Sequence, residues 1–424
     1  MMKQNEIRCV RAREIISGRG IPAVEVEVKT SAGFVVRASS PSGTSVAAHE
    51  ALEVRDPGTR YGGKGVLKAV ENVNSVIGPA LIGIDTTKQH EIDHLMIALD
   101  GTSHKSKLGG NALTATSLAV AKAGAISVNL ELYQYIGGVR ASRLPIVCLN
   151  MISGSPTAGN NLDFEDYLLC PYGFESFSEL LEASIKVFHV LHQRLESDFG
   201  PIPQITALAP PLKTNEDAFA AIVRAIDEAG YSGRIGVGID AAVAQLYDEE
   251  RERYIFRNGT YTRDELIDYY AHLASEYPLL FIEDGLHEDD FEGFAQMTTR
   301  LPMIIIGDDL FATNTDRLMT GRDIGAANAI LFKVNQAGTV SEAVSTAETA
   351  HVLNYTVVAS TRSGETNDAA QADLAVGIGA RMMKLGCPLR GEMVAKYNRL
   401  LKIEEHLGAA AGIQTLPIAP GIEQ

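Results

Sequence analysis

Short, uninterrupted apolar runs in the second half of the chain constrain its fold more than any other feature. Helical patterns lie between most of these runs, and each run ends in a polar residue: RIGVGID, PLLFIED, MIIIGDD, AILFKVN and TVVAST. Continuous apolar strands that alternate with helices predict a parallel sheet that is buried on both faces. Many such units in series favour a closed α/β barrel, with an open doubly wound sheet as the alternative. No GxGxxG motif follows an early strand, which argues against a dinucleotide-binding fold.

The first part of the chain has a different pattern. The stretch IPAVEVEVKT alternates apolar and charged residues, as a half-exposed strand does. The tripeptide SAG joins it to GFVVRASS, which predicts a hairpin, and helical patterns follow at about residues 65–82 and 111–126. A chain of 424 residues is too long for one ordinary core. We therefore predict a small α+β domain over residues 1–140 and a barrel domain, which carries the active site, over residues 141–424.

Composition restricts the partners of the protein. The chain has 37 Lys and Arg against 53 Asp and Glu, a formal net charge of −16. This balance argues against nucleic acids and anionic membranes, although a small anionic ligand remains compatible with it. The amino terminus lacks the apolar core of a signal peptide, no run of about 18 apolar residues occurs, and the four cysteines are far apart. We expect a reduced, cytoplasmic protein.

Three carboxylates stand at the ends of predicted barrel strands. These are Asp240, Glu283 and Asp308, and the active site of such a barrel lies at the carboxyl ends of its strands. A single acidic residue in this position is usually a helix cap or a turn former. Acidic residues at the ends of successive strands favour a functional site instead. Three converging negative charges repel one another, so a hard cation is expected between them. Oxygen ligands without His or Cys favour Mg²⁺ over zinc.

Lys333 ends the next strand, in AILFKVNQ, and the apolar run before it predicts that it is buried. Burying an ammonium group is costly unless something compensates the charge. A lysine beside a dication should have a lowered pKa, and the neutral amine could then act as a general base. Arg362 and Ser363 follow the strand after that, although RSG alone is a weak signal.

The sequence resembles the enolase family, the phosphopyruvate hydratases, along essentially its whole length. The resemblance is carried by these stretches: GRGIPAVEVEV, PSGTS, HEALEVRD, GKGVLKAVENVN, LDGTSHKSKLGGNA, FIEDGLHEDDFEGF, GDDLFATNT, RSGET, NDAAQADLAVG and VAKYNRLLKIEE. It implies an amino-terminal α+β domain followed by an enolase-like (β/α)8 barrel. It also implies a homodimer or a multiple of dimers.

The resemblance implies roles for the strand-end residues. Asp240, Glu283 and Asp308 would hold one Mg²⁺, and Lys333 would remove the proton alpha to the carboxylate of the substrate. Use of a Lys or His base with Mg²⁺ is the general pattern of enolase-superfamily sites.

Further roles fall on residues outside that set. Arg362 and Ser363 would bind the phosphate, and Lys384, in RMMKLG, would neutralise the substrate carboxylate. Ser45, in the PSGTS loop, would reach a possible second Mg²⁺.

The chain departs from the family pattern where the leaving group is handled. The GDEGG-type loop, whose glutamate assists loss of hydroxide, is replaced by ITALAPPLKTNEDA, and no acidic residue occurs between Asp198 and Glu216. Thr157 and Thr361 stand where the family has active-site histidines. Removing an acid of this kind typically costs about 10²–10⁴-fold in rate.

A second departure lies at Glu165-Asp166, which replaces the Gln-Glu pair of the family. Glu165 could supply the missing acid, because crowding beside other carboxylates raises a pKa. We expect Thr157 and Asp166 to contact the substrate. The mobile loop reads PSGTSVAA and lacks the glycine that follows its Ser-Thr pair in the family.

Three interpretations follow from this combination. The first is an enolase-family enzyme with altered leaving-group chemistry on a phospho- or phosphonocarboxylate, similar to carboxyphosphonoenolpyruvate synthase of phosphonate biosynthesis, and this is the main expectation. The second is a housekeeping phosphopyruvate hydratase with unusual loops. The third is a non-catalytic paralogue, which would not require the retained metal ligands and base.

Overall fold

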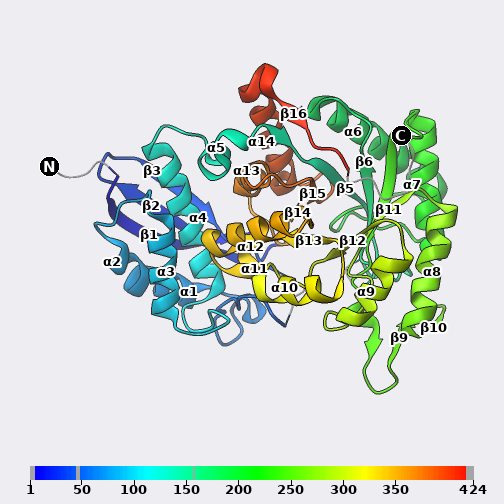
Figure 1. The fold of residues 1–424 in the computed structure, drawn as a ribbon, viewed down its shortest axis with the longest axis horizontal. Coiled ribbons are helices and arrows are strands. Elements are labelled where there is room, and N and C mark those ends of the chain that lie inside the picture. The colour runs from blue at the N-terminus through cyan, green and yellow to red at the C-terminus, as the bar shows by residue number, and fades with distance from the viewer. Residues whose placement is uncertain (1–4, 44–47, 156–157, 417–424) are drawn as a thin grey trace.

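The amino-terminal part of the chain forms a three-stranded antiparallel sheet with helices packed on it (Figure 1). In this computed structural model, which describes residues 5–43, 48–155 and 158–416, the strands are β1 (Ile7–Ile16), β2 (Pro22–Thr30) and β3 (Val35–Ser39). The alternation in β2 buries Val24, Val26 and Val28 completely, while the glutamates between them lie at the partly exposed face. The predicted hairpin therefore joins β2 to β3, and its turn contains Gly33 with φ +91°.

Five helices accompany this sheet: α1 (Leu67–Asn72), α2 (Gly78–Leu81), α3 (Gln89–Asp100), α4 (Gly110–Ser127) and α5 (Leu132–Gly137). The helix predicted at about 65–82 is interrupted by a π-helical segment, Val73–Ile77, between α1 and α2. Helix α4 is rich in alanine and small residues, contacts β2 and β3, and is buried over nearly its whole length. Among the described residues, no single helix is long and apolar enough to cross a membrane. One bent pair of helical segments, 110–127 with 132–140, has sufficient length and apolar composition when the two are taken together.

The second part of the chain closes into an eight-stranded barrel in the order β11-β12-β13-β14-β15-β5-β6-β7. The strands are β5 (Ile146–Ser153), β6 (Asp166–Pro171), β7 (Ile235–Asp240), β11 (Leu279–Glu283), β12 (Ile304–Gly307), β13 (Ala329–Phe332), β14 (Thr356–Ser360) and β15 (Met382–Leu385). Nearly every residue of these strands is buried, which agrees with the continuous apolar runs. The closed barrel is confirmed, and the open doubly wound sheet is excluded.

One barrel strand differs from the predicted parallel arrangement. Strand β6 pairs antiparallel with both β5 and β7, whereas the other barrel pairs are parallel. The segment between β5 and β6 carries no helix in its described residues, and a connection of this kind returns the chain in the opposite direction. As a result the amino end of β6, at Asp166, lies at the same edge of the barrel as the carboxyl ends of the other strands.

Helices cover the outside of the barrel (Figure 1). They are α6 (Phe177–Phe199), α7 (Asn215–Ala229), α8 (Arg263–Glu276), α9 (Phe291–Arg300), α10 (Thr315–Ile324), α11 (Val334–Ala337), α12 (Val340–Val352), α13 (Ala370–Gly377) and α14 (Gly391–Leu407). The remaining strands are β4 (Arg143–Leu144), which pairs with β16 (Gly412–Ile413), and a small sheet of β8 (Tyr247–Asp248), β9 (Arg253–Phe256) and β10 (Gly259–Tyr261).

Polar contacts fasten the amino-terminal helices to the barrel. Helices α3 and α4 pack against α12, and α4 also packs against α11. The Ser341 amide donates to the fully buried Asp93 over 3.0 Å, and Lys105 Nζ lies 2.8 Å from Glu342 Oε1. Because these contacts are buried or partly buried, the two parts of the chain form a fixed junction beside the carboxyl ends of the barrel strands.

We expect Lys122→Met to lower the free energy of unfolding by about 2–3 kcal/mol, because it leaves the Asp368 carboxylate without its charged donor. Lys122 Nζ lies 2.6 Å from Asp368 Oδ1 across this junction. Burial alone would raise the pKa of Asp368, but the ion pair with Lys122 lowers it overall. The ion pair therefore stabilises the protein above the usual pKa of 3.8, and this contribution is lost as pH falls through the lower folded-state value.

Urea unfolding near pH 7 and below about pH 4 checks this prediction, since the difference between wild type and variant should shrink in acid. Lys88→Met, which breaks the exposed pair of Lys88 with Glu91, is the matched control and should cost less than about 1 kcal/mol. Equal losses in the two variants would contradict the prediction.

Candidate active site

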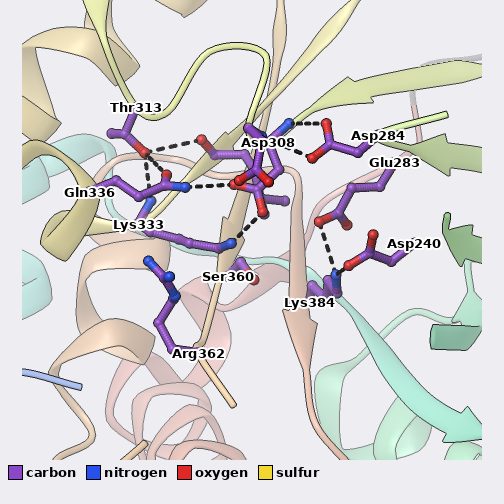
Figure 2. A network of polar contacts seen from close by, with 12 residues as sticks. Asp240, Glu283, Asp284, Asp308, Thr313, Lys333, Gln336, Ser360, Arg362 and Lys384 are labelled. Carbon is purple, nitrogen blue, oxygen red and sulfur yellow. Dashed lines mark hydrogen bonds and ion pairs between the residues drawn. The ribbon is translucent and has the colours of Figure 1, made fainter. Parts of the chain in front are cut away.

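A hollow at the carboxyl ends of the barrel strands gathers most of the residues that the sequence singled out (Figure 2). It is lined by Asn150, Glu165, Asp166, Thr206, Asp240, Ala242, Ala244, Gln245, Asp284, Leu286, Glu288, Asp308, Asp309, Lys333, Thr361, Arg362, Ser363, Lys384, Leu385, Gly386, Arg390 and Met393. Glu283 lies beneath this lining and is completely buried. Two predicted site residues, Ser45 and Thr157, lie outside the described residues.

Lys333 occupies the first position after β13, where the strand ends and α11 begins. Its side chain is buried and makes a short ion pair with Asp308 Oδ2, and its backbone amide donates to Thr313 Oγ1 over 3.0 Å. Burial lowers the pKa of this lysine, but the neighbouring carboxylates, led by Asp308, raise it overall. The lowered pKa expected of Lys333 beside a dication therefore stays a prediction, because the raised pKa reflects the protein's own carboxylates alone.

Gln336 fixes the other oxygen of Asp308, and sequence reasoning missed it. Its Nε2 donates to Asp308 Oδ1 over 2.8 Å, and its Oε1 accepts from Thr313 Oγ1 over 2.7 Å. Thr313 in turn holds the backbone of Lys333, so the three groups form one buried network. The short spacing in KVNQ, which places an amide three residues after the lysine, was the available signal.

Lys384 lies between two of the predicted metal ligands (Figure 2). Its Nζ makes a short contact with Asp240 Oδ2 and lies 2.9 Å from Glu283 Oε1. Burial lowers the pKa of Lys384, but Asp240 and Glu283 raise it well above its usual value. Since β7 and β11 pair Asp240 with Glu283 in register, the two carboxylates converge on this ammonium group, which compensates their repulsion.

The donor set fits a hard divalent cation. Glu283 Oε2 is buried and has no hydrogen-bond partner among the described residues, an arrangement that costs free energy unless a ligand satisfies the oxygen. Asp240 and Asp308 carry further oxygens at the same edge of the barrel, and no His or Cys lines the hollow among the described residues.

A second cluster, Asp284, Asp308 and Asp309, has carboxylate oxygens within 4.8 Å of one another. The oxygens of Asp284 already accept the backbone amides of Asp308 and Asp309, each over 2.9 Å, so this side chain braces the end of β12. Burial and the charge of Asp308 raise the pKa of Asp309 to about 7. We therefore favour Asp240, Glu283 and Asp308 as the ligand set.

Arg362 reaches the hollow from the loop after β14. Its Nη1 and Nη2 lie 2.7 and 3.3 Å from the two oxygens of Glu50, a residue of the amino-terminal part that sequence reasoning missed. Burial lowers the pKa of Arg362, but Glu50 raises it above its usual value. Ser363 lines the hollow beside it.

Asp166 and Glu165 enter the hollow because β6 runs antiparallel. Asp166 Oδ1 accepts from Ser153 Oγ over 3.0 Å and makes a short contact with Asn150. Burial is the main reason why the pKa of Asp166 rises to about 6, and the charge of Asp240 adds to the shift. The backbone of Glu165 is held by Asp240 and by Gly154, so its position is set by the strand pairing.

The divergent stretch at residues 199–215 contributes no ionisable side chain to the lining of the hollow. Of residues 199–215, all of which the structure describes, Thr206 is the one that lines the hollow, and its Oγ1 lies 2.6 Å from Ser153 Oγ. Thr361 lines the hollow near Met393. This agrees with the absence of acidic residues that the sequence shows between Asp198 and Glu216.

Comparisons with known proteins identify both parts of the chain. Residues 7–136 match the family model described as Enolase, N-terminal domain, and residues 141–416 match Enolase, C-terminal TIM barrel domain. The chain is 50% identical over 410 residues to a protein named Enolase from Methanopyrus kandleri, covering 95% of this chain and 96% of the relative. It is 48% identical over 414 residues to the Enolase of Pyrococcus furiosus, covering 96% of each chain.

We expect Glu283→Gln to abolish stabilisation of the protein by Mg²⁺. Loss of even an outer-shell partner costs about 10–100-fold in metal affinity, so loss of a direct ligand should cost at least about 100-fold. Thermal unfolding with and without Mg²⁺ measures the effect, because a cation that binds the folded state raises its stability.

Asp309→Asn is the matched control for the alternative acidic cluster, and it should retain the shift in unfolding temperature. A shift that survives in Glu283→Gln and disappears in Asp309→Asn would assign the cation to Asp284, Asp308 and Asp309 instead.

Proposed function

Since the chain belongs to the enolase family, we propose that it is a hydro-lyase that converts 2-phosphoglycerate to phosphoenolpyruvate. The relatives named Enolase match at 46–50% identity over essentially the whole length of both chains. They favour this alternative over altered chemistry on a phosphonate, which was the main expectation from the sequence. The observation that carries the proposal is Lys333, held by Asp308 in a buried hollow that also contains Arg362 and Lys384.

Asp240, Glu283 and Asp308 would hold the Mg²⁺ that enolases use. When bound, the metal supplies positive charge beside the substrate carboxylate, where negative charge accumulates as the alpha proton is removed. Glu283 Oε2, which is buried and has no hydrogen-bond partner within the described part of the chain, supports this assignment.

Lys333 would take the proton from the carbon alpha to the carboxylate. Its Nζ forms an ion pair with Asp308, so the amine stands beside a carboxylate that would also hold the metal. The charge left on the substrate spreads onto its carboxylate oxygens, and Lys384, which also lines the hollow, would neutralise it.

Arg362 and Ser363 would bind the phosphate of the substrate. A guanidinium group presents paired donors that suit an oxyanion, and Ser363 offers a hydroxyl beside it. The phosphate is bonded through oxygen to the carbon that loses its proton, but its own bonds neither form nor break in the dehydration, so these contacts contribute to binding more than to the chemical step.

Glu165 would donate the proton that leaves with the hydroxide as the carbon–oxygen bond breaks. It lines the hollow next to Asp166, and no other carboxylate enters from residues 199–215. A carboxylic acid at this position would act as the general acid that the departing hydroxide requires.

One observation favours a second candidate, enolate formation with a different leaving group. The stretch that carries the acid in the family brings Thr206 to the hollow, and Thr361 replaces a family histidine. A protein of this kind would exchange the alpha proton of 2-phosphoglycerate into heavy water with Mg²⁺ but would not release phosphoenolpyruvate.

We expect Mg²⁺-dependent formation of phosphoenolpyruvate from 2-phosphoglycerate, and we expect Lys333→Ala to lower it by about 10²–10⁴-fold, since removing a general base typically has this effect. The ultraviolet absorbance of the enol product follows the reaction. Unaltered thermal unfolding of the variant would show that folding is retained. Absence of turnover in folded wild-type protein that binds Mg²⁺ would contradict the proposed dehydration.

We expect Glu165→Gln to slow phosphoenolpyruvate formation by about 10²–10⁴-fold while exchange of the alpha proton into heavy water continues. The amide cannot donate an acidic proton to the leaving hydroxide, whereas proton removal by Lys333 does not require it. Nuclear magnetic resonance of the substrate reports the exchange. An unchanged rate of product formation would remove Glu165 from the mechanism.

A further inference from the structure

The guanidinium group of Arg362 is held by a carboxylate from the other part of the chain. Arg362 is 6% exposed and Glu50 is 4% exposed. Arg362 Nη1 and Nη2 lie 2.7 and 3.3 Å from Glu50 Oε2 and Oε1. The residues are 312 positions apart in sequence. Burying a guanidinium group is costly without a paired carboxylate, so this contact fixes where the positive charge stands.

Glu50 stands on a fixed piece of backbone. The Ala51 amide donates to the Gln336 carbonyl over 2.8 Å, and the Leu52 amide donates to the His104 carbonyl over 2.8 Å. Gln336 is also the residue that holds Asp308. The segment 50–52 is therefore attached to the same barrel residue that orients the metal-side carboxylate.

A hydrogen bond within the barrel fixes the backbone end of Arg362. The Arg362 amide donates to Glu365 Oε1 over 3.1 Å, and Glu365 Oε2 lies 2.9 Å from the completely buried Lys396 Nζ. A long side chain with an anchored backbone still has several rotatable bonds, so its guanidinium requires a second anchor to stay in one orientation. Glu50 supplies that anchor from the amino-terminal part.

We infer that Glu50 is a positioning residue for substrate binding: it orients the guanidinium of Arg362 toward the phosphate without touching the substrate. The inference rests on the proposed function in one respect, which is that Arg362 binds the phosphate. Because the phosphate contact is made equally in the bound substrate and in the transition state, Glu50 acts on KM and leaves kcat nearly unchanged. The amino-terminal domain thus contributes directly to the affinity of a site that the barrel carries.

Steady-state kinetics of Glu50→Gln with 2-phosphoglycerate tests the inference. The glutamine side chain has nearly the shape of glutamate, but its NH₂ group replaces one carboxylate oxygen and places a donor opposite the guanidinium of Arg362. We expect KM to rise about 10- to 100-fold with kcat within about threefold of wild type. Glu50→Asp, which keeps the charge on a shorter side chain, should give an intermediate KM.

A double-mutant cycle separates positioning from general destabilisation. In an Arg362→Lys background, Glu50→Gln should change KM by less than about threefold, because the partner through which it acts has been replaced. Glu14→Gln breaks another two-point contact between a glutamate and an arginine, Arg60, at residues that do not line the hollow, and it should leave KM unchanged. An unchanged or lower KM in Glu50→Gln, or an equal effect in both backgrounds, would overturn the inference.

Binding of inorganic phosphate, measured by calorimetry, keeps this test separate from the proposed reaction. If folded wild-type protein binds phosphate but does not form phosphoenolpyruvate, the proposed function fails, and weaker phosphate binding by Glu50→Gln still supports the inference. If Glu50→Gln does not fold, Glu50→Asp takes its place in both measurements. Equal phosphate affinity in wild type and in the folded variant would overturn the inference.

Discussion

The compensation of buried charge at one edge of the barrel is the constraint on which the site depends. Asp240, Glu283 and Asp308 stand at the ends of adjacent strands. Asp308 forms an ion pair with Lys333, and Asp240 and Glu283 form ion pairs with Lys384. Like charges this close cannot remain ionised in a buried place without cations. The two lysines compensate the charge of the carboxylates, and Glu283 Oε2 remains without a hydrogen-bond partner among the described residues.

The site belongs to both parts of the chain. Barrel strands supply the acidic and basic side chains, while Glu50 of the amino-terminal part holds Arg362, and Ala51 is bonded to the carbonyl of Gln336. Gln336 in turn holds Asp308. This arrangement gives the interface between the two parts a chemical purpose beyond packing, because the orientation of a cation in the hollow depends on a residue from across the interface.

Two residues that diverge from the enolase pattern, Thr206 and Thr361, line the hollow. The hollow retains the acidic, lysine and arginine residues to which the enolase resemblance gives roles, whereas Thr206 and Thr361 line it where the resemblance would place other groups. Identity of 46–50% over the whole chain to proteins named Enolase supports common chemistry. The antiparallel β6 brings Glu165 and Asp166 into the hollow. The hollow therefore contains these two carboxylates, although the stretch between Asp198 and Glu216 has no acidic residue.

The sequence by itself determined the barrel and the identity of its polar strand ends, because continuous apolar runs at a regular spacing have few other stable arrangements. It could not give the direction of β6, since strand direction depends on the connection and not on the composition of the strand. It also could not pair Glu50 with Arg362, 312 residues away, nor reveal that Lys333 forms an ion pair with Asp308. Those features depend on distances between charges, and only the tertiary structure sets these distances.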